Sequence, residues 1–143
     1  MLTPLLKKDL FWALLDSKLE MVKEFNRSFD IQNETKPSLL SKEKFQLKLN
    51  IMQEELDEYK EACENEDLVE VADAIVDMMY VLYGIIIQHG LSDVFYDMFQ
   101  EVHKSNMSKL ERGKPLRRSD GKILKGSEYF KPDLKNILDG ERK

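Results

Sequence analysis

Two clusters of acidic residues are the part of this sequence best suited to chemistry. The first is Glu54-Glu55-Leu56-Asp57-Glu58, and the second begins twelve residues after Glu58, at Glu70-Val71-Ala72-Asp73. The second cluster opens the apolar stretch 71–87, where a carboxylate is costly to bury unless it is paired or holds a metal ion. Because carboxylates are preferred ligands of Mg²⁺, and Mg²⁺ held in this way usually meets a phosphate, the two clusters predict a shared Mg²⁺ site.

The first cluster lies at the margin of and inside the apolar arc of its helix, which advances by about 100° per residue. Glu58 lies about 40° from Glu54, and Glu55 lies about 100° from Glu54, inside the apolar arc of this segment. A solvated acidic helix face is the alternative interpretation of this cluster, and Asp57 remains open as a further ligand.

The second cluster forms a single acidic stripe. Glu70, Asp73 and Asp77 fall within about 60° of one another on a helix that is otherwise apolar nearly all round. Such a helix is normally buried, and unpaired acids on it are rare. This favours a metal site over a solvated face.

Composition limits the class of protein. At 143 residues the chain is expected to form one domain, and 6 Gly and 4 Pro argue against an all-β fold. A net charge of −5 gives no support to nucleic-acid binding, although the segment 104–131 is locally basic. The single Cys63 excludes an internal disulfide, and the apolar run 74–87 is interrupted by Asp77 and short for a membrane span. We therefore expect a cytoplasmic protein.

Apolar periodicity and helix-end signals predict an all-α, four-helix-bundle-like fold. Ser41 is a candidate N-cap for the second helix, and Gly90 is a candidate C-terminal cap for the third. Phe25 and Phe29 on the first helix, like Phe11 and Trp12 before them, are expected in the core, with base stacking as an alternative. The expected helices cover 5–29, 41–65, 66–89 and 92–110, and the tail 111–143 is expected to be ordered but irregular and to close over the site.

Four segments, taken in order, resemble the MazG-like, all-α nucleoside triphosphate pyrophosphohydrolases, a superfamily that includes phosphoribosyl-ATP pyrophosphohydrolases and dimeric dUTPases. The two acidic clusters are similar to the signature of this group, and residues 22–29 are similar to its first-helix motif, except that Asn26 stands where His is expected. Residues 73–77, continuing to Tyr80 and Gly84, resemble its metal helix. One subgroup also shares the segment 102–110 and a C-terminal pattern matched by 121–126, Tyr129 and 132–134.

The resemblance implies roles for individual residues. Glu55 is expected to orient or deprotonate the attacking water, and Asp77 to lie behind the metal ligands or to touch the nucleotide sugar. The Mg²⁺ ligands, with Mn²⁺ as a substitute metal, would be Glu54, Glu55, Glu58, Glu70 and Asp73. The remaining substrate-binding residues would be Asn106, Lys109, Lys125 and Tyr129.

The resulting hypothesis is an enzyme that hydrolyses a (deoxy)nucleoside triphosphate between the α and β phosphates, acting on dUTP or on aberrant nucleotides. The alternatives are a phosphoribosyl-ATP pyrophosphohydrolase and a non-catalytic helical or nucleotide-binding module. A di-iron oxidase needs Glu three residues before a His, whereas Ile86 and Gln100 precede His89 and His103 at that spacing. The apolar third helix and the resemblance both imply a homodimer or homotetramer.

Overall fold

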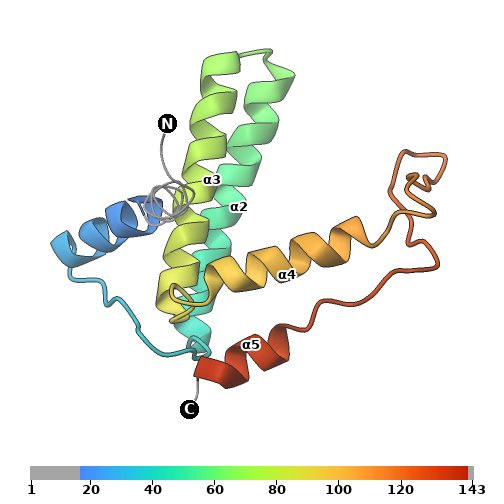
Figure 1. Cartoon of the computed structure of the whole chain (residues 1–143). Coiled ribbons are helices and arrows are strands. Elements are labelled where there is room, and N and C mark those ends of the chain that lie inside the picture. The colour runs from blue at the N-terminus through green and yellow to red at the C-terminus, as the bar shows by residue number, and fades with distance from the viewer. Residues whose placement is uncertain (1–16, 142–143) are drawn as a thin grey trace, which may run out of the picture. The chain divides into compact units, whose positions relative to one another are not determined.

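The computed structural model describes residues 17–141 and shows an all-α fold (Figure 1). No β-strand is formed within these residues; extended pairing is limited to two isolated bridges in the tail. None of the helices in this range is long and apolar enough to cross a membrane. The first sixteen residues, which include Phe11 and Trp12, lie outside the described range. In chain order the helical elements are 17–28, α2 (Lys42–Glu64), α3 (Leu68–Gln88), α4 (Phe95–Met107) and α5 (Leu134–Glu141).

Helix α2 begins and ends at the capping signals found in the sequence. The Ser41 side chain accepts a hydrogen bond from the backbone N–H of Lys44 at 3.4 Å, and Asn65 is the C-cap. Glu66 then adopts a positive φ of 55°, the left-handed conformation that commonly ends a helix. The connection to α3 is short, and the two helices therefore pack side by side in antiparallel orientation (Figure 1).

Helix α3 is fixed at both ends by specific contacts. The Asp67 side chain caps its N-terminus by accepting from the backbone N–H groups of Val69 and Glu70 at 3.0 and 3.2 Å. At the other end His89 is the C-cap and Gly90 follows with φ 67°, as predicted. These caps fix the residues at which α3 begins and ends.

The loop before α2 is attached to the C-terminal end of α3. The backbone N–H of Ser38 donates to the His89 carbonyl at 3.0 Å, and His89 Nδ1 donates to the Ser38 carbonyl at 2.7 Å. Gly90 has no side chain where Lys36 crosses it: a Cβ there would lie 2.0 Å from the Lys36 carbonyl oxygen. The structure therefore assigns His89 a structural role and makes Gly90 sterically necessary.

By internal contacts the chain divides into two compact units, of which the first ends at Ser92 and the second begins at Asp93. The second unit contains α4 and the tail. The tail includes α5, which the sequence analysis missed when it described 111–143 as irregular. Its signals are Asp133, whose carboxylate accepts from the Asn136 backbone N–H, and the apolar residues Leu134, Ile137 and Leu138 at helical spacing.

Within the second unit the tail runs back along α4. Gly126 N–H donates to the Lys109 carbonyl at 2.9 Å, and the Ser105 hydroxyl donates to the Phe130 carbonyl at 2.8 Å. Further along, the backbone N–H of Asp133 donates to Glu101 Oε1 at 3.0 Å. These hydrogen bonds attach residues 126, 130 and 133 of the tail to α4 and to the residue that follows its C-cap.

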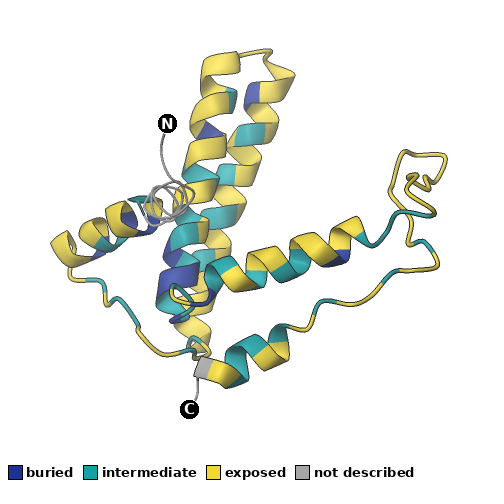
Figure 2. Ribbon diagram, viewed as in Figure 1, coloured by how far each residue is buried: buried dark blue, intermediate teal, exposed yellow. Residues whose placement is uncertain are grey.

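Few of the described residues of the first unit are buried (Figure 2), and many of its large apolar side chains are exposed. Phe25 and Phe29, predicted to be core residues, are 40% and 64% exposed. Their rings instead pack on each other with centroids 4.4 Å apart, and Phe25 meets Tyr80 of α3 edge-on at 5.6 Å, so they cover a helix surface rather than fill an interior. Between residues 17 and 92 the buried apolar residues are Leu19, Val22, Ala62, Ala74, Ile86 and Ile87.

Candidate active site

The acidic residues of α2 and α3 lie in the first unit, between the middle of each helix and the connection that joins them. Glu54 and Glu58 of α2 are exposed, as are Glu70 and Asp73 of α3, whereas Glu55 is half-buried. A cavity of about 350 Å³ opens between the helices at this end. It is lined by Glu58, Glu61, Ala62, Asn65, Asp67, Glu70 and Asp73.

Glu55 is affected by the charges of acidic residues on both α2 and α3. Its Oε2 atom is shielded from solvent and has no hydrogen-bond partner among the described residues. Burial raises the pKa of the Glu55 carboxyl, and the negative charges of Asp77, Glu58, Asp73 and Glu54 raise it further, in that order. A carboxylate in such surroundings is stabilised by a cation.

The donor chemistry of the cluster fits Mg²⁺. Its members supply carboxylate oxygens, which Mg²⁺ prefers, and Glu55 Oε2 is a buried acceptor that still lacks a donor. Over residues 17–141 no three His, Cys, Asp or Glu side chains are arranged to hold a metal ion. Because like-charged carboxylates repel one another, drawing these side chains into one ligand set requires the positive charge of the ion itself.

Other acids have more specific surroundings. Asp77 is half-buried, and its charge acts on Glu55. Asp57, left open as a ligand, is exposed and accepts a hydrogen bond from Gln53 at 2.9 Å. The structure therefore links Asp77 to the cluster and gives Asp57 a local partner on its own helix.

Three polar residues that line the cavity had not been predicted as site residues from the sequence. Glu61 follows Glu58 by one helical turn, a spacing that could have indicated it. Asn65 and Asp67 enter the cavity because they are the caps on either side of the tight connection. A capping residue can be recognised from the sequence. Whether that residue also lines a cavity depends on how the two helices pack.

The substrate-binding residues predicted from the second unit form two pairs. Lys109 Nζ donates to Asn106 Oδ1 at 2.7 Å, and Lys125 Nζ lies 4.4 Å from the centre of the Tyr129 ring. The hydrogen bond from Gly126 to Lys109 holds the two pairs near one another at the C-terminal end of α4. The unit thus gathers two lysines, an amide and an aromatic ring, which is a suitable set for a nucleotide. That these four residues bind the substrate remains a prediction.

Asn26, which departs from the histidine of the resembled motif, is a buried structural residue. Its side chain is 4% exposed, and its Nδ2 donates to Asn33 Oδ1 at 2.9 Å. Asn33 Nδ2 in turn donates to the Lys23 carbonyl at 3.1 Å, and Ile31 N–H donates to the Asn26 carbonyl at 2.8 Å. This network closes the turn after the first helix, which gives Asn26 a structural role.

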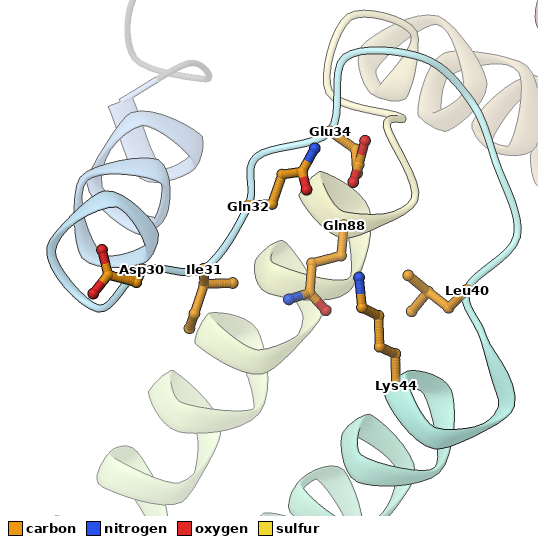
Figure 3. Close-up of a pocket in the computed structure, with 7 residues that line it drawn as sticks. All are labelled: Asp30, Ile31, Gln32, Glu34, Leu40, Lys44 and Gln88. Atoms are coloured by element: carbon orange, nitrogen blue, oxygen red, sulfur yellow. The ribbon is translucent and has the colours of Figure 1, made fainter.

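The turn leads to a second cavity of about 280 Å³, which Figure 3 shows in close-up. Lys44, near the start of α2, and Gln88, at the end of α3, point into the same space beneath the loop (Figure 3). Two acids and a second amide from the loop complete its polar lining. The full lining is Asp30, Ile31, Gln32, Glu34, Leu40, Lys44 and Gln88.

An all-α fold in which two antiparallel helices carry facing carboxylates is that of the all-α nucleotide pyrophosphohydrolases. The family model described as phosphoribosyl-ATP pyrophosphohydrolase matches residues 22–106, more than half of the chain, and the chain belongs to this family, within the MazG-like superfamily. The resemblance found in the sequence is thereby confirmed, and so is the prediction of an enzyme, a pyrophosphohydrolase acting on an acid anhydride. A search of curated proteins found no match.

Proposed function

We propose that the chain catalyses Mg²⁺-dependent addition of water to the α–β phosphoanhydride of a nucleoside triphosphate, releasing a monophosphate and pyrophosphate. The observation that supports this most strongly is the half-buried Glu55, with an unpaired oxygen and four acidic neighbours from two helices. Enzymes of the family typically depend on Mg²⁺, and a triphosphate can approach an acidic site only when cations screen the repulsion.

Under this proposal the metal ligands are the five acids named from the sequence, and Glu55 has the second task of binding the attacking water. Mg²⁺, when bound, would neutralise phosphate charge and lower the pKa of the attacking water. An oxygen of Glu55 that does not hold the ion would accept a proton from that water. Asp77 lies one turn beyond Asp73, and its charge acts on Glu55; it would lie behind the metal ligands or touch the nucleotide sugar. The five proposed ligands are Glu54, Glu55, Glu58, Glu70 and Asp73.

Phosphoribosyl-ATP is the substrate that the family match favours. The second candidate is an ordinary or aberrant (deoxy)nucleoside triphosphate such as dUTP. It is supported by the tail: the motifs at 121–126, Tyr129 and 132–134 resemble a nucleotide-hydrolysing subgroup and lie beyond the matched residues 22–106. In both cases Asn106, Lys109, Lys125 and Tyr129 are proposed to bind nucleotide or phosphate.

We further propose that the protein acts in the cytoplasm as a homodimer or homotetramer. The support for self-association is the apolar surface that the first unit leaves uncovered, including Leu68 at 78% and Val69 at 75% exposure. Where such side chains form a contiguous surface, it usually marks a contact with another protein surface.

The test is pyrophosphate release from phosphoribosyl-ATP and from a panel of NTPs and dNTPs, with Mg²⁺ and then with EDTA. Release that stops on chelation is the expected result, and the preferred substrate separates the two candidates. Failure of every substrate to yield pyrophosphate in the presence of Mg²⁺ would refute the proposed reaction.

A further inference from the structure

Lys48 of α2 lies on nearly the same face of the helix as Glu55. Lys48 is half-buried, and it makes no hydrogen bond or ion pair with any residue that the structure describes. Its Nζ lies 3.5 Å from the position that a Cβ would take on Gly84 of α3, so the ammonium group occupies the space left by the missing side chain.

The position of Lys48 relative to the acids follows from helix geometry. Lys48 precedes Glu55 by seven residues on α2, which places it on nearly the same face and about 10 Å away along the axis. Gly84 likewise follows Asp77 by seven residues on α3. The cation and the acidic cluster therefore lie along one stripe between the same two helices.

The surroundings of Lys48 are mostly apolar. Together with Leu40, Phe45, Leu49, Met52, Ile85 and His89 it lines a cavity of about 230 Å³. Burial among these groups lowers the pKa of the Lys48 ammonium, which is the response expected of a cation with no anion nearby. An anionic ligand would remove this penalty.

Few other cations are available on this face. Helix α3 contains no Lys or Arg, and the basic residues of α2 are Lys42, Lys44, Lys48 and Lys60. Lys60 is exposed and pairs with Glu64 at 3.7 Å. Among the α2 lysines Lys48 combines partial burial, lack of a partner and a place on the acidic stripe.

We propose that Lys48 binds a phosphate group of the substrate, about 10 Å along the α2–α3 stripe from Glu55. This inference rests on the proposed function, because it takes the bound anion to be part of the nucleotide. Two sources of phosphate fit: the triphosphate chain, and the second phosphate that phosphoribosyl-ATP carries on its additional ribose.

The first arm of the test measures binding without catalysis. The melting temperature of Lys48→Met is compared with that of the unaltered protein in Mg²⁺, with inorganic tripolyphosphate and separately with ribose 5-phosphate. We expect Lys48→Met to melt at the same or a higher temperature without ligand, and to lose the shift given by one of the two probes. Loss with tripolyphosphate identifies the triphosphate chain, and loss with ribose 5-phosphate identifies the phosphoribosyl group.

The second arm measures kcat/KM for pyrophosphate release from phosphoribosyl-ATP and from the best NTP or dNTP. Losing one charge-assisted hydrogen bond should lower kcat/KM by about 10- to 100-fold, mainly through KM. The loss should affect both substrates if Lys48 holds the triphosphate, and phosphoribosyl-ATP alone if it holds the second phosphate. Lys48→Arg should retain most of the activity, and Lys48→Gln serves in place of Lys48→Met if the latter folds poorly.

Lys60→Met is the matched control, because it removes the same charge from the exposed side of the same helix. It should behave as the unaltered protein in both arms. The inference is overturned if Lys48→Met keeps both probe shifts and an unchanged kcat/KM. If no substrate is hydrolysed but the probe shift is still lost in Lys48→Met, the proposed reaction fails while the phosphate site stands.

Discussion

At the scale of single residues, Glu55 connects the sequence to the chemistry. Helical spacing alone placed it inside the apolar arc of its helix, and the structure shows it half-buried with an unpaired oxygen. The proximity of Asp77 and Asp73 could not be derived in the same way, because it depends on how α2 and α3 pack. The spacing of the acids thus predicts on which face of its own helix each acid lies. Which acids of α2 and α3 lie close enough to affect each other's pKa can be known only from the fold.

Replacing Glu55 with Gln should stabilise the metal-free protein. The substitution removes a half-buried charge surrounded by four others, so we expect a higher free energy of unfolding at neutral pH in EDTA. The pKa of Glu55 is raised in the folded state, so its charge opposes folding above that pKa and has no such effect below the ordinary carboxyl pKa of about 4.3.

Thermal unfolding in EDTA between pH 4 and pH 8 measures this difference. The gain from Glu55→Gln should shrink as the pH falls toward the ordinary carboxyl pKa. Asp57→Asn is the control, since Asp57 is exposed and bound to Gln53 on its own helix, and it should give no such gain. A Glu55→Gln protein that is less stable at neutral pH would contradict this description of the cluster.

At the scale of elements, the ends of α2 and α3 were predicted well, whereas one short helix and the attachment of a loop were not. Ser41, Asn65 and Gly90 mark the ends of α2 and α3 within a residue or two, because capping is a local interaction that the sequence encodes directly. Helix α5 was missed although Asp133 and its apolar spacing were present, since the surrounding Gly, Pro and basic residues favoured an irregular segment. The attachment of the loop to the end of α3 joins residues far apart in sequence and left no local signal.

Replacing Gly90 with Ala should disrupt this attachment. A Cβ at Gly90 would lie 2.0 Å from the Lys36 carbonyl oxygen, and the residue has φ 67°. We expect a loss of unfolding free energy of about 3 kcal/mol or more, since backbone strain and a backbone clash add together.

Gly113→Ala provides the comparison for Gly90→Ala. Gly113 has a similar φ of 77° but nothing within 4 Å of its Cβ position, so only the conformational cost of about 1–2 kcal/mol applies. Urea unfolding of both variants measures the difference. Equal losses would show that the contact with Lys36 does not hold the loop.

At the scale of the whole molecule, the all-α fold and the family followed from composition and from the order of the motifs. The sequence also correctly predicted that α3 is apolar. It led us to expect a buried helix, but several apolar residues of α3 are exposed within the single chain. Ile75, Met79 and Leu82 are all more than 40% exposed and lie on the side of α3 away from its acids. A single sequence indicates which faces of a helix are apolar. It does not indicate which part of the same chain, or of another chain, packs against each face.

If this surface is a subunit interface, Ile75→Glu should dissociate the oligomer. A charge placed on an apolar contact is costly to desolvate, so the molar mass measured by light scattering should fall toward that of one 16.8 kDa chain. Thr35→Glu, on an exposed loop of the same unit, should leave the mass unchanged. An unaltered protein that is already monomeric at micromolar concentration would contradict the proposed self-association.

The central claim is that the facing acids of α2 and α3 form a metal-dependent catalytic site. The most direct measurement is pyrophosphate release from the preferred nucleotide as Mg²⁺ is titrated, for the unaltered protein, Glu55→Gln and Asp73→Ala. We predict a rate that saturates with Mg²⁺ and vanishes in EDTA, and that falls by about 100-fold or more in both variants while helicity is retained. Pyrophosphate release that persists in EDTA, or that both variants retain, would contradict the account.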